Sequence, residues 1–235
     1  MLSGELETEL DTEEQWIAVS DLISGLMILF LLIAVMYLAI VERQNDEIER
    51  VVVLYEDLRE ELHADLLQEF AADLPRWGAE LDKDLKFRFT NTDVLFEEGE
   101  SDLKADFAII LDDFFPRYLA ILSSDAYRSE ILEVRIEGHT SSSWSQAQDS
   151  DDAYLLNMAL SQERTRTTLG YILELTAVAH EKVWLRERLT ANGLSSSQLI
   201  LSNSGDEDAQ RSRRVEFVVI TDAETRLSTI LQEIR

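Results

Sequence analysis

The chain shows three successive patterns of apolar and polar residues, and the first is a long apolar run. The stretch WIAVSDLISGLMILFLLIAVMYLAIV (16–41) contains a single charge, Asp21, and no ionisable residue follows from Leu22 to Val41. Twenty residues of α-helix rise about 30 Å, which is the thickness of a bilayer's hydrocarbon core. The pattern predicts one transmembrane helix over residues 16–41, preceded by an N-terminal tail over residues 1–15.

The second pattern is a helical stripe that follows the apolar run. No glycine or proline occurs between Gly25 and Pro75, and apolar residues recur at intervals of three or four. The stripe consists of Val41, Ile48, Val51, Tyr55, Leu58, Leu62, Leu66 and Phe70. This spacing predicts a helical stalk within residues 42–80. We favour pairing of the stripe with a second copy of the chain; the alternative is that it packs on the chain's own globular domain.

The third pattern mixes strand-like alternation with helical spacing and predicts a globular domain over residues 81–222. Alternating segments at 85–96, 131–140, 198–203 and 213–221 predict strands, whereas 101–124 and 154–180 have helical spacing. The predicted fold is therefore a single N-terminal transmembrane helix followed by an α+β domain. That domain is an α/β sandwich with a mixed sheet and helices on one face. Residues 223–235 are predicted to form a helical tail.

Composition narrows the possible functions. The chain has 21 Lys+Arg against 47 Asp+Glu, a formal net charge of -26, which argues against nucleic acid as a partner. There is no cysteine, and the three histidines lack the H-E-x-x-H spacing of metallohydrolases. No nucleophile–base pair or phosphate-binding loop stands out. We therefore expect a protein that is not an enzyme and has neither a cofactor nor a metal site.

The segments that flank the apolar run do not decide its orientation. The leader MLSGELETELDTEEQ is acidic and no small-residue cleavage site follows it, so a signal peptide is not predicted. Arg43, Arg50 and Arg59 follow the span, and counting them weakly places the C-terminal side in the cytoplasm. Long domains cross membranes largely regardless of charge, so the physics of the sequence leaves the topology open.

Four separated motifs in the C-terminal half resemble the OmpA/MotB peptidoglycan-binding domain. In chain order they are DVLF (93–96) with Gly99, IEGHT (136–140), Asn157 with Leu160, Ser161 and Arg164, and Gly205 with RRVE (213–216). The resemblance covers residues 85–221. It implies a groove beside the second helix that binds the peptide stem of peptidoglycan.

The resemblance also implies which residues contact the ligand, namely Thr140, Asn157, Leu160 and Arg164. The last three are spaced i, i+3 and i+7, which places them on one helical face. An arginine can bind a free carboxylate with two hydrogen bonds, and an asparagine amide can bind a peptide group. The alternative is that Arg164 pairs with one of the many acidic residues of the chain.

One position departs from the family pattern. The family usually follows GHT with an aspartate that pairs with the ligand's ammonium group, but Ser141 stands here. Three interpretations remain open: the long loop that follows replaces the carboxylate through Asp149, Asp151 or Asp152, the pocket binds weakly, or it reads another feature of the wall. The same three acids can also ligate Ca²⁺, although they lack the EF-hand spacing, so a solvated loop is favoured.

The apolar span of the N-terminal half, together with the wall-binding domain of the C-terminal half, resembles a MotB-like stator subunit. The resemblance implies that Asp21 carries protons, or sodium ions, through a channel formed with a multi-span MotA-like partner, two copies of this chain lying inside a ring of five partners. It also implies an inner-membrane protein with a cytoplasmic N-terminus and a periplasmic domain.

The span itself, W-x-x-x-S-D-L-x-x-G-L-M-x-x-F (16–30), looks more like the ZorB family of Zorya anti-phage defence systems than like flagellar MotB. The MotA-like partner would then be ZorA-like. The alternatives are a flagellar or other ion-driven stator, and a passive tether between membrane and cell wall.

The position of Asp21 along the span fits an ion carrier. Trp16 and Tyr37 are interface-type residues 21 positions apart, about 31 Å along a helix, so they can bracket one bilayer core. In that frame Asp21 lies about 7.5 Å inside the core. A carboxylate at that depth is costly unless it faces protein or water, as functional membrane carboxylates do. Ser24 and Gly25 allow a neighbouring helix to come close.

Overall fold

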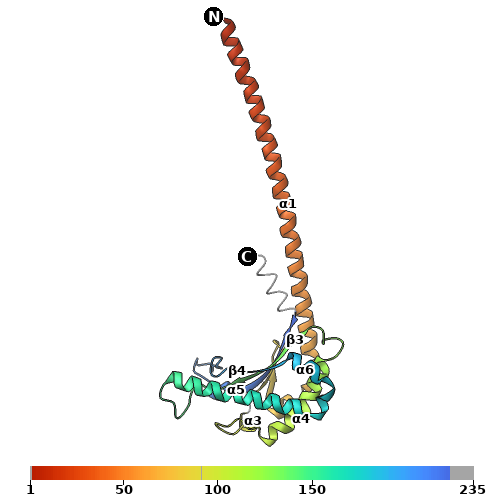
Figure 1. The fold of residues 1–235 in the computed structure, drawn as a ribbon, viewed down its shortest axis with the longest axis vertical. Coiled ribbons are helices and arrows are strands. Elements are labelled where there is room, and N and C mark those ends of the chain that lie inside the picture. Colours follow the sequence, from red (N-terminus) through yellow and green to blue (C-terminus); the bar gives the residue numbers. More distant parts are fainter. Residues whose placement is uncertain (1, 91, 223–235) are drawn as a thin grey trace. The chain divides into compact units, whose positions relative to one another are not determined.

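The computed structural model describes residues 2–90 and 92–222, which fall into two compact units, Met1–Val51 and Val52–Arg235. Helix α1 (Leu2–Phe70) is continuous through both units (Figure 1). In the first unit it contains one segment, Val19–Asp46, that is long and apolar enough to cross a membrane, with a mean hydropathy of 2.7. Every side chain from Val19 to Ile40 is exposed in the isolated chain. The predicted apolar helix is therefore confirmed.

The second unit is built on a five-stranded mixed sheet in the order β1-β2-β5-β3-β4. The strands are β1 (Ala79–Leu81), β2 (Lys86–Phe89), β3 (Ile131–His139), β4 (Leu189–Gly193) and β5 (Arg214–Thr221). β5 lies in the centre and pairs antiparallel with β2 and β3, and only β4 runs parallel to its neighbour, β3. The predicted α+β domain with a mixed sheet is confirmed.

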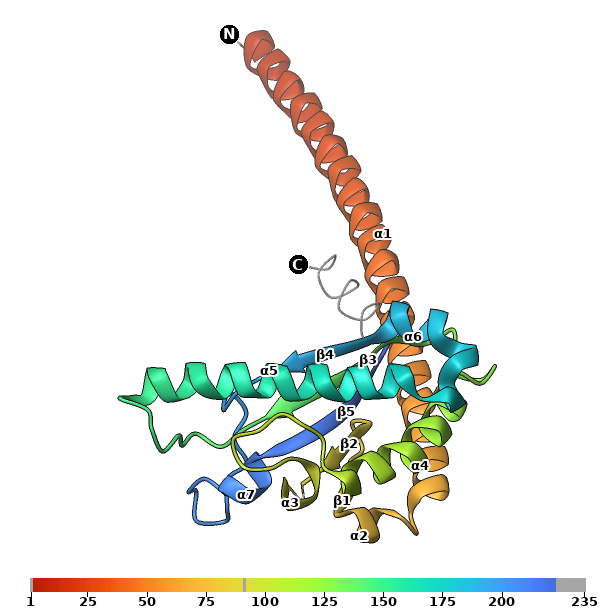
Figure 2. The same cartoon turned by 60° about the horizontal axis from the view of Figure 1, so that its bottom comes forward.

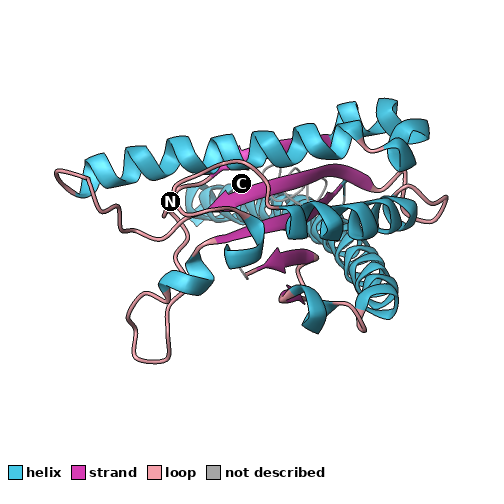
Figure 3. Cartoon of the chain, turned by 90° about the horizontal axis from the view of Figure 1, so that it is seen from below, coloured by secondary structure: helices cyan, strands magenta, loops and turns pink. Residues whose placement is uncertain are grey.

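Two long helices lie along this sheet, α4 (Ala105–Leu122) and α5 (Ser150–Glu174) (Figure 2). Seen from below, the strands lie side by side and α5 runs along them (Figure 3). Two strand glycines permit the close approach of α5. A Cβ on Gly138 would lie 2.8 Å from the Ser161 carbonyl oxygen, and one on Gly193 would lie 2.2 Å from the Gln162 backbone nitrogen. The two glycines therefore allow α5 to pack directly against β3 and β4.

The remaining helices are short. They are α2 (Leu74–Trp77), α3 (Thr92–Leu95), α6 (Lys182–Arg188), α7 (Ala209–Ser212) and the 3₁₀ helix η1 (Thr176–Glu181). Gly78 ends α2 with a φ of 60°, a left-handed conformation that glycine adopts without strain. The chain therefore turns at Gly78 before it enters β1.

Aromatic rings dominate the core between the helices and the sheet. Phe114 of α4 lies 4.5 Å from Phe87 and 4.9 Å from Tyr118, centroid to centroid, and 5.2 Å from Phe217 of β5. All four side chains are fully buried. Rings at these separations contribute about 0.5–1.5 kcal/mol per pair beyond their burial.

The end of α1 belongs to this core, which corrects the favoured interpretation of the helical stripe. Leu62, Leu66 and Phe70 are buried in the domain, and the Phe70 ring lies 5.4 Å from Phe114. Asp65 accepts a hydrogen bond from the Tyr127 hydroxyl at 2.7 Å. For these positions the alternative holds: the stripe packs on the chain's own domain. The division at Val51/Val52 also places the domain's start well before the predicted residue 81.

Several predicted element bounds were wrong. Strand 85–96 ends at Phe89, and α3 follows it. Helix 101–124 begins at Ala105, with Lys104 at its N-cap, and ends at Leu122. The segment 198–203 contributes only an isolated bridge between Leu201 and Glu207, and the fourth strand is instead β4. The predicted tail helix over 223–235 lies outside the described residues.

Candidate functional site

The loop between β3 and α5 is the centre of the predicted wall-binding site, and hydrogen bonds hold it from three sides. The Thr140 backbone N–H donates to the Ser195 carbonyl at 2.9 Å. The Asn157 amide of α5 donates to the Ser143 carbonyl at 3.3 Å. The Ser142 N–H donates to the Glu207 carboxylate at 3.0 Å. The loop is therefore fixed to α5 and to the segment that precedes β5.

Ser195 is the link between Thr140 and α5. Its backbone N–H donates to the Ser161 hydroxyl at 3.1 Å, and its own hydroxyl donates to the Tyr154 carbonyl at 2.8 Å. Ser195 is fully buried and has a φ of 53°, the left-handed region in which non-glycine residues are uncommon. This turn gives Thr140 a fixed place. The Thr140 hydroxyl is buried and has no hydrogen-bond partner among the described residues.

Arg164 of α5 is buried, and its guanidinium group already donates hydrogen bonds to the protein backbone. Its Nε donates to the Glu100 carbonyl at 2.8 Å and its Nη2 to the Glu97 carbonyl at 3.1 Å. The guanidinium also lies over the Phe96 ring, 4.8 Å from its centroid. Burial and the nearby Arg213 lower the pKa of Arg164 to about 10, so it stays protonated at neutral pH. Arg164 thus attaches the loop 97–100 to α5.

Two of the three acids of the long loop, Asp149 and Asp152, accept hydrogen bonds at the start of α5. Asp149 is the N-cap residue, and its carboxylate accepts hydrogen bonds from the N–H groups of Asp151 and Asp152 at 3.0 and 2.9 Å. Asp152 in turn accepts from the Gln148 N–H at 3.0 Å. Such caps satisfy backbone donors that the first helical turn leaves free. Asp149 and Asp152 are therefore engaged in ending the loop, which gives a structural reason for this acidic run.

Glu207 is a carboxylate that the sequence motifs did not indicate. It lies beside Ser141, the residue that stands in place of the family's aspartate. Glu207 binds both the N–H and the hydroxyl of Ser142, the residue that follows Ser141. It directly follows the turn 202–206, in which Gly205 has a φ of 91°. Glu207 lies 65 residues after Ser142, so only the folded chain reveals that the two are neighbours. Leu160, the remaining predicted contact residue, is half-buried.

The other face of the sheet carries a network of charged side chains. Glu216 accepts from Arg88 at 2.6 Å and from Arg214 at 2.5 Å, and Arg135 binds Glu133 at 2.7 Å and Glu137 at 3.4 Å. Burial alone would raise the pKa of Glu216, but the two guanidinium groups lower it to about 2. Glu216 is therefore ionised at any physiological pH.

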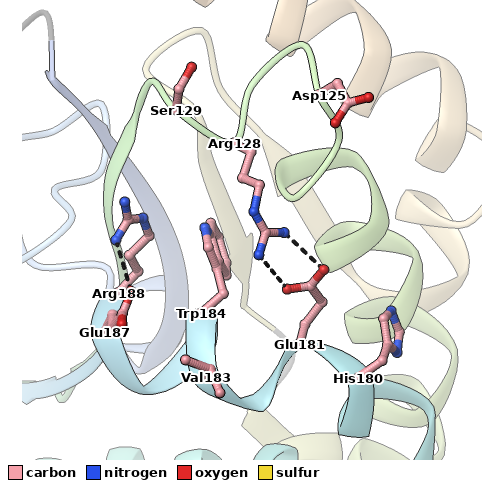
Figure 4. A pocket seen from close by; sticks show the side chains of 9 residues that line it. All are labelled: Asp125, Arg128, Ser129, His180, Glu181, Val183, Trp184, Glu187 and Arg188. Atoms are coloured by element: carbon pink, nitrogen blue, oxygen red, sulfur yellow. Dashed lines mark hydrogen bonds and ion pairs between the residues drawn. The ribbon is translucent and has the colours of Figure 1, made fainter.

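A depression of about 560 Å³ lies elsewhere, at the start of β3. Figure 4 shows Arg128 bound to Glu181 and the Trp184 indole between Arg128 and Arg188. The Arg128–Glu181 bonds, 2.8 and 2.9 Å long, attach the turn before β3 to η1. None of the predicted contact residues lines this depression, so we assign it a structural role.

Two Zorya proteins are similar to this chain in sequence. The Zorya protein ZorB of Escherichia coli (strain Crooks) is 46% identical over 221 residues, covering 94% of this chain and 93% of that protein. A Zorya protein ZorB from a second E. coli strain is 23% identical over 208 residues, covering 86% and 78%. No family model matches the chain.

MotB-like proteins are among the solved structures that match part of the chain. A MotB-like protein from Desulfovibrio vulgaris is 25% identical with a TM-score of 0.47 and covers 69% of this chain and 94% of that chain. The periplasmic domain of Helicobacter pylori MotB (residues 78–256) is 16% identical with a TM-score of 0.42 and covers 63% and 84%.

Proposed function

Since this chain belongs to the ZorB family of Zorya proteins, we propose that it is the wall-anchored, stator-like subunit of an ion-driven membrane motor in anti-phage defence. One observation carries the proposal: the match to a Zorya ZorB protein at 46% identity extends over 94% of the chain. It therefore includes both the apolar helix with Asp21 and the folded domain. The motor's second component would be a multi-span MotA-like, or ZorA-like, protein, and two copies of this chain would act within its ring of five.

Asp21 is the residue through which ions would pass. Its carboxylate is exposed on α1 within the segment Val19–Asp46. A charged group at membrane depth is stable only where it faces protein or water. The partner's helices would supply that environment, and Gly25, which has open space around its Cα, would admit them closely. The domain would then lie in the periplasm, and the N-terminus in the cytoplasm of an inner-membrane protein.

Phage protection tests the role of Asp21. We expect Asp21→Asn to abolish protection in a plaque assay, because an amide cannot gain and lose a proton at membrane depth. Asp46→Asn, at the end of the same span, is the matched control and should retain protection. Full protection by Asp21→Asn at unchanged protein level would exclude the ion-carrier role.

The folded domain would bind peptidoglycan at the loop between β3 and α5. Thr140 lies in this loop, Asn157 holds it, and Leu160 and Arg164 follow Asn157 on α5; the buried Thr140 hydroxyl is without a partner among the described residues. We further propose that Glu207 supplies the negative charge that the family's aspartate supplies elsewhere. Its support is proximity: Glu207 binds Ser142, two residues after the GHT motif.

Binding to purified peptidoglycan tests this assignment. Glu207→Gln keeps the size of the side chain and an oxygen that can accept from Ser142, but it removes the charge. We expect it to weaken co-sedimentation with peptidoglycan at least several-fold. Asp206→Asn, on the neighbouring exposed residue, should bind like the parent protein. Equal binding by both variants would remove Glu207 from the site.

A passive tether between membrane and wall is the second candidate, because Asp21 on an isolated helix is also compatible with a position among lipid headgroups. Purification from membranes distinguishes the two. A motor subunit should co-purify with a multi-span partner in a fixed ratio, whereas a tether should come out alone.

A further inference from the structure

Three buried side chains on the sheet face opposite α5 are brought together by strand pairing. Glu137 and His139 are two residues apart on β3 and therefore point to the same face. Glu216 of β5 is the direct cross-strand partner of Glu137. One potential ligand atom from each side chain lies within 4.8 Å of the others. The three residues are separated by up to 79 positions in sequence, so no spacing motif reveals them.

Three polar atoms of this cluster have no hydrogen-bond partner among the described residues. Neither ring nitrogen of His139 has a hydrogen-bond partner among the described residues, nor does Oε2 of Glu216. The His139 side chain is 0% exposed, and its Nε2 lies 3.6 Å from Glu137 Oε2, beyond hydrogen-bond distance. A buried polar group without a partner destabilises the folded state, so this arrangement calls for a further ligand.

The chemistry of the free atoms indicates that the missing ligand is a cation, because a carboxylate oxygen and an imidazole nitrogen are both common metal ligands. Glu137 and Glu216 face each other directly across the strands, and Arg135 on one side and Arg88 and Arg214 on the other offset their charges. Arg88 and Arg214 both bind Oε1 of Glu216 and leave Oε2 free. Metal-ligating carboxylates are held in just this way by hydrogen bonds from outer residues.

We propose that Glu137, His139 and Glu216 bind a divalent transition-metal ion, and that zinc is the ion their donors suit best. One imidazole and two carboxylates are ordinary zinc ligands, with bonds of about 2.0–2.2 Å that place ligand atoms about 3.4 Å apart. The three ligand atoms lie within 4.8 Å of one another and would move closer together when the ion binds.

The bound ion would have a structural consequence for the wall-binding loop. His139 immediately precedes Thr140, and Glu137 and His139 occupy the end of β3 from which the loop departs. A metal that joins β3 to β5 at this point would stabilise the strand pair that presents the loop. Metal binding would then raise the domain's resistance to unfolding, because the unfolded chain does not assemble the site.

Zinc binding by the full chain in detergent tests the proposal, with a purification tag that contains no histidine. After treatment with EDTA, titration of Zn²⁺ against a competing chromophoric chelator should show one ion per chain. His139→Gln should weaken this binding at least tenfold. The control is the double variant His63→Gln/His180→Gln, which leaves His139 as the single histidine of a chain without cysteine. It should bind zinc like the parent protein.

Two outcomes would overturn the proposal. One is the lack of stoichiometric zinc binding by the parent chain. The other is binding that persists in His139→Gln, as expected for weak adsorption to an acidic surface. If circular dichroism shows His139→Gln to be unfolded, Co²⁺ added to the double variant decides instead. Visible absorption bands typical of nitrogen and oxygen ligation support the site, and a spectrum identical to that of Co²⁺ in buffer refutes it.

Discussion

Glu216 is a single residue that makes the stability of this fold depend on pH. Two guanidinium groups lower its pKa to about 2, below the usual value near 4.5. Such a group stabilises the folded state above its unfolded pKa, and the contribution is lost as the pH falls through about 4.5 towards 2. The shift corresponds to about 3 kcal/mol of folding free energy at neutral pH.

We therefore predict that the free energy of unfolding of the parent chain declines between about pH 4.5 and 2. Glu216→Gln should be less stable at pH 7 and should show a smaller decline in this range, because the titrating group is gone. Chemical unfolding followed by circular dichroism at several pH values measures both. Glu98→Gln, on an exposed residue, serves as the control and should keep the full decline. Equal pH dependence in all three proteins would contradict the role of Glu216.

The residues of the candidate site differ in how far sequence could identify them. Asp21 stands out because it interrupts a run that is otherwise apolar, and Asn157 and Arg164 follow from a local motif. Glu207, by contrast, is next to Ser142 only because the turn before β5 returns to the end of β3. The cluster of Glu137, His139 and Glu216 likewise depends on the register of two strands. Local spacing contains no information about such pairs.

At the scale of elements, the packing of α5 on the sheet rests on glycine. Gly138→Ala would place a Cβ 2.7 Å from the Thr165 Cγ2 and 2.8 Å from the Ser161 carbonyl oxygen. We predict a loss of about 1–3 kcal/mol, because α5 must move away from β3. Gly170→Ala in the same helix meets nothing within 4 Å and should stabilise the domain by up to about 1 kcal/mol.

Thermal unfolding compares the stability of the two variants. They are matched because each replaces a glycine by an alanine, one in β3 and one in α5. Opposite shifts of the melting temperature are expected. A neutral Gly138→Ala would show that the contact between α5 and β3 is looser than described.

Elements with strong local patterns could be predicted from sequence, and those defined by their neighbours could not. β3 and β5 alternate clearly and were found within one residue. β4 reads LTANG and has few apolar residues, because it lies at the edge beside α5 and is positioned by parallel pairing with β3. The apolar segment QLILSN (198–203) suggested a strand, yet Leu201 is exposed and forms a single bridge.

At the scale of the whole molecule, the domain begins inside α1 rather than after it. Leu66 is fully buried among the aromatic rings, whereas Val53 on the same helix is 52% exposed. We predict that Leu66→Ala lowers the free energy of unfolding by about 2–5 kcal/mol. Val53→Ala should change it by no more than about 0.5 kcal/mol.

Denaturant unfolding of the full chain in detergent compares these two variants. Equal effects of the two substitutions would mean that the end of α1 is a separate stalk, as the stripe of apolar residues first suggested. The same stripe pattern fits either a partner helix or an intramolecular core, so sequence alone could not choose between them.

The account as a whole rests on ions passing along Asp21, and ion flux is its most direct test. The chain would be purified together with its multi-span partner and reconstituted in liposomes with dyes for protons and sodium. We predict flux of one of these ions in the parent complex, none with Asp21→Asn and unchanged flux with Asp46→Asn. Equal flux with Asp21→Asn, in a complex of unchanged composition, would contradict the central claim.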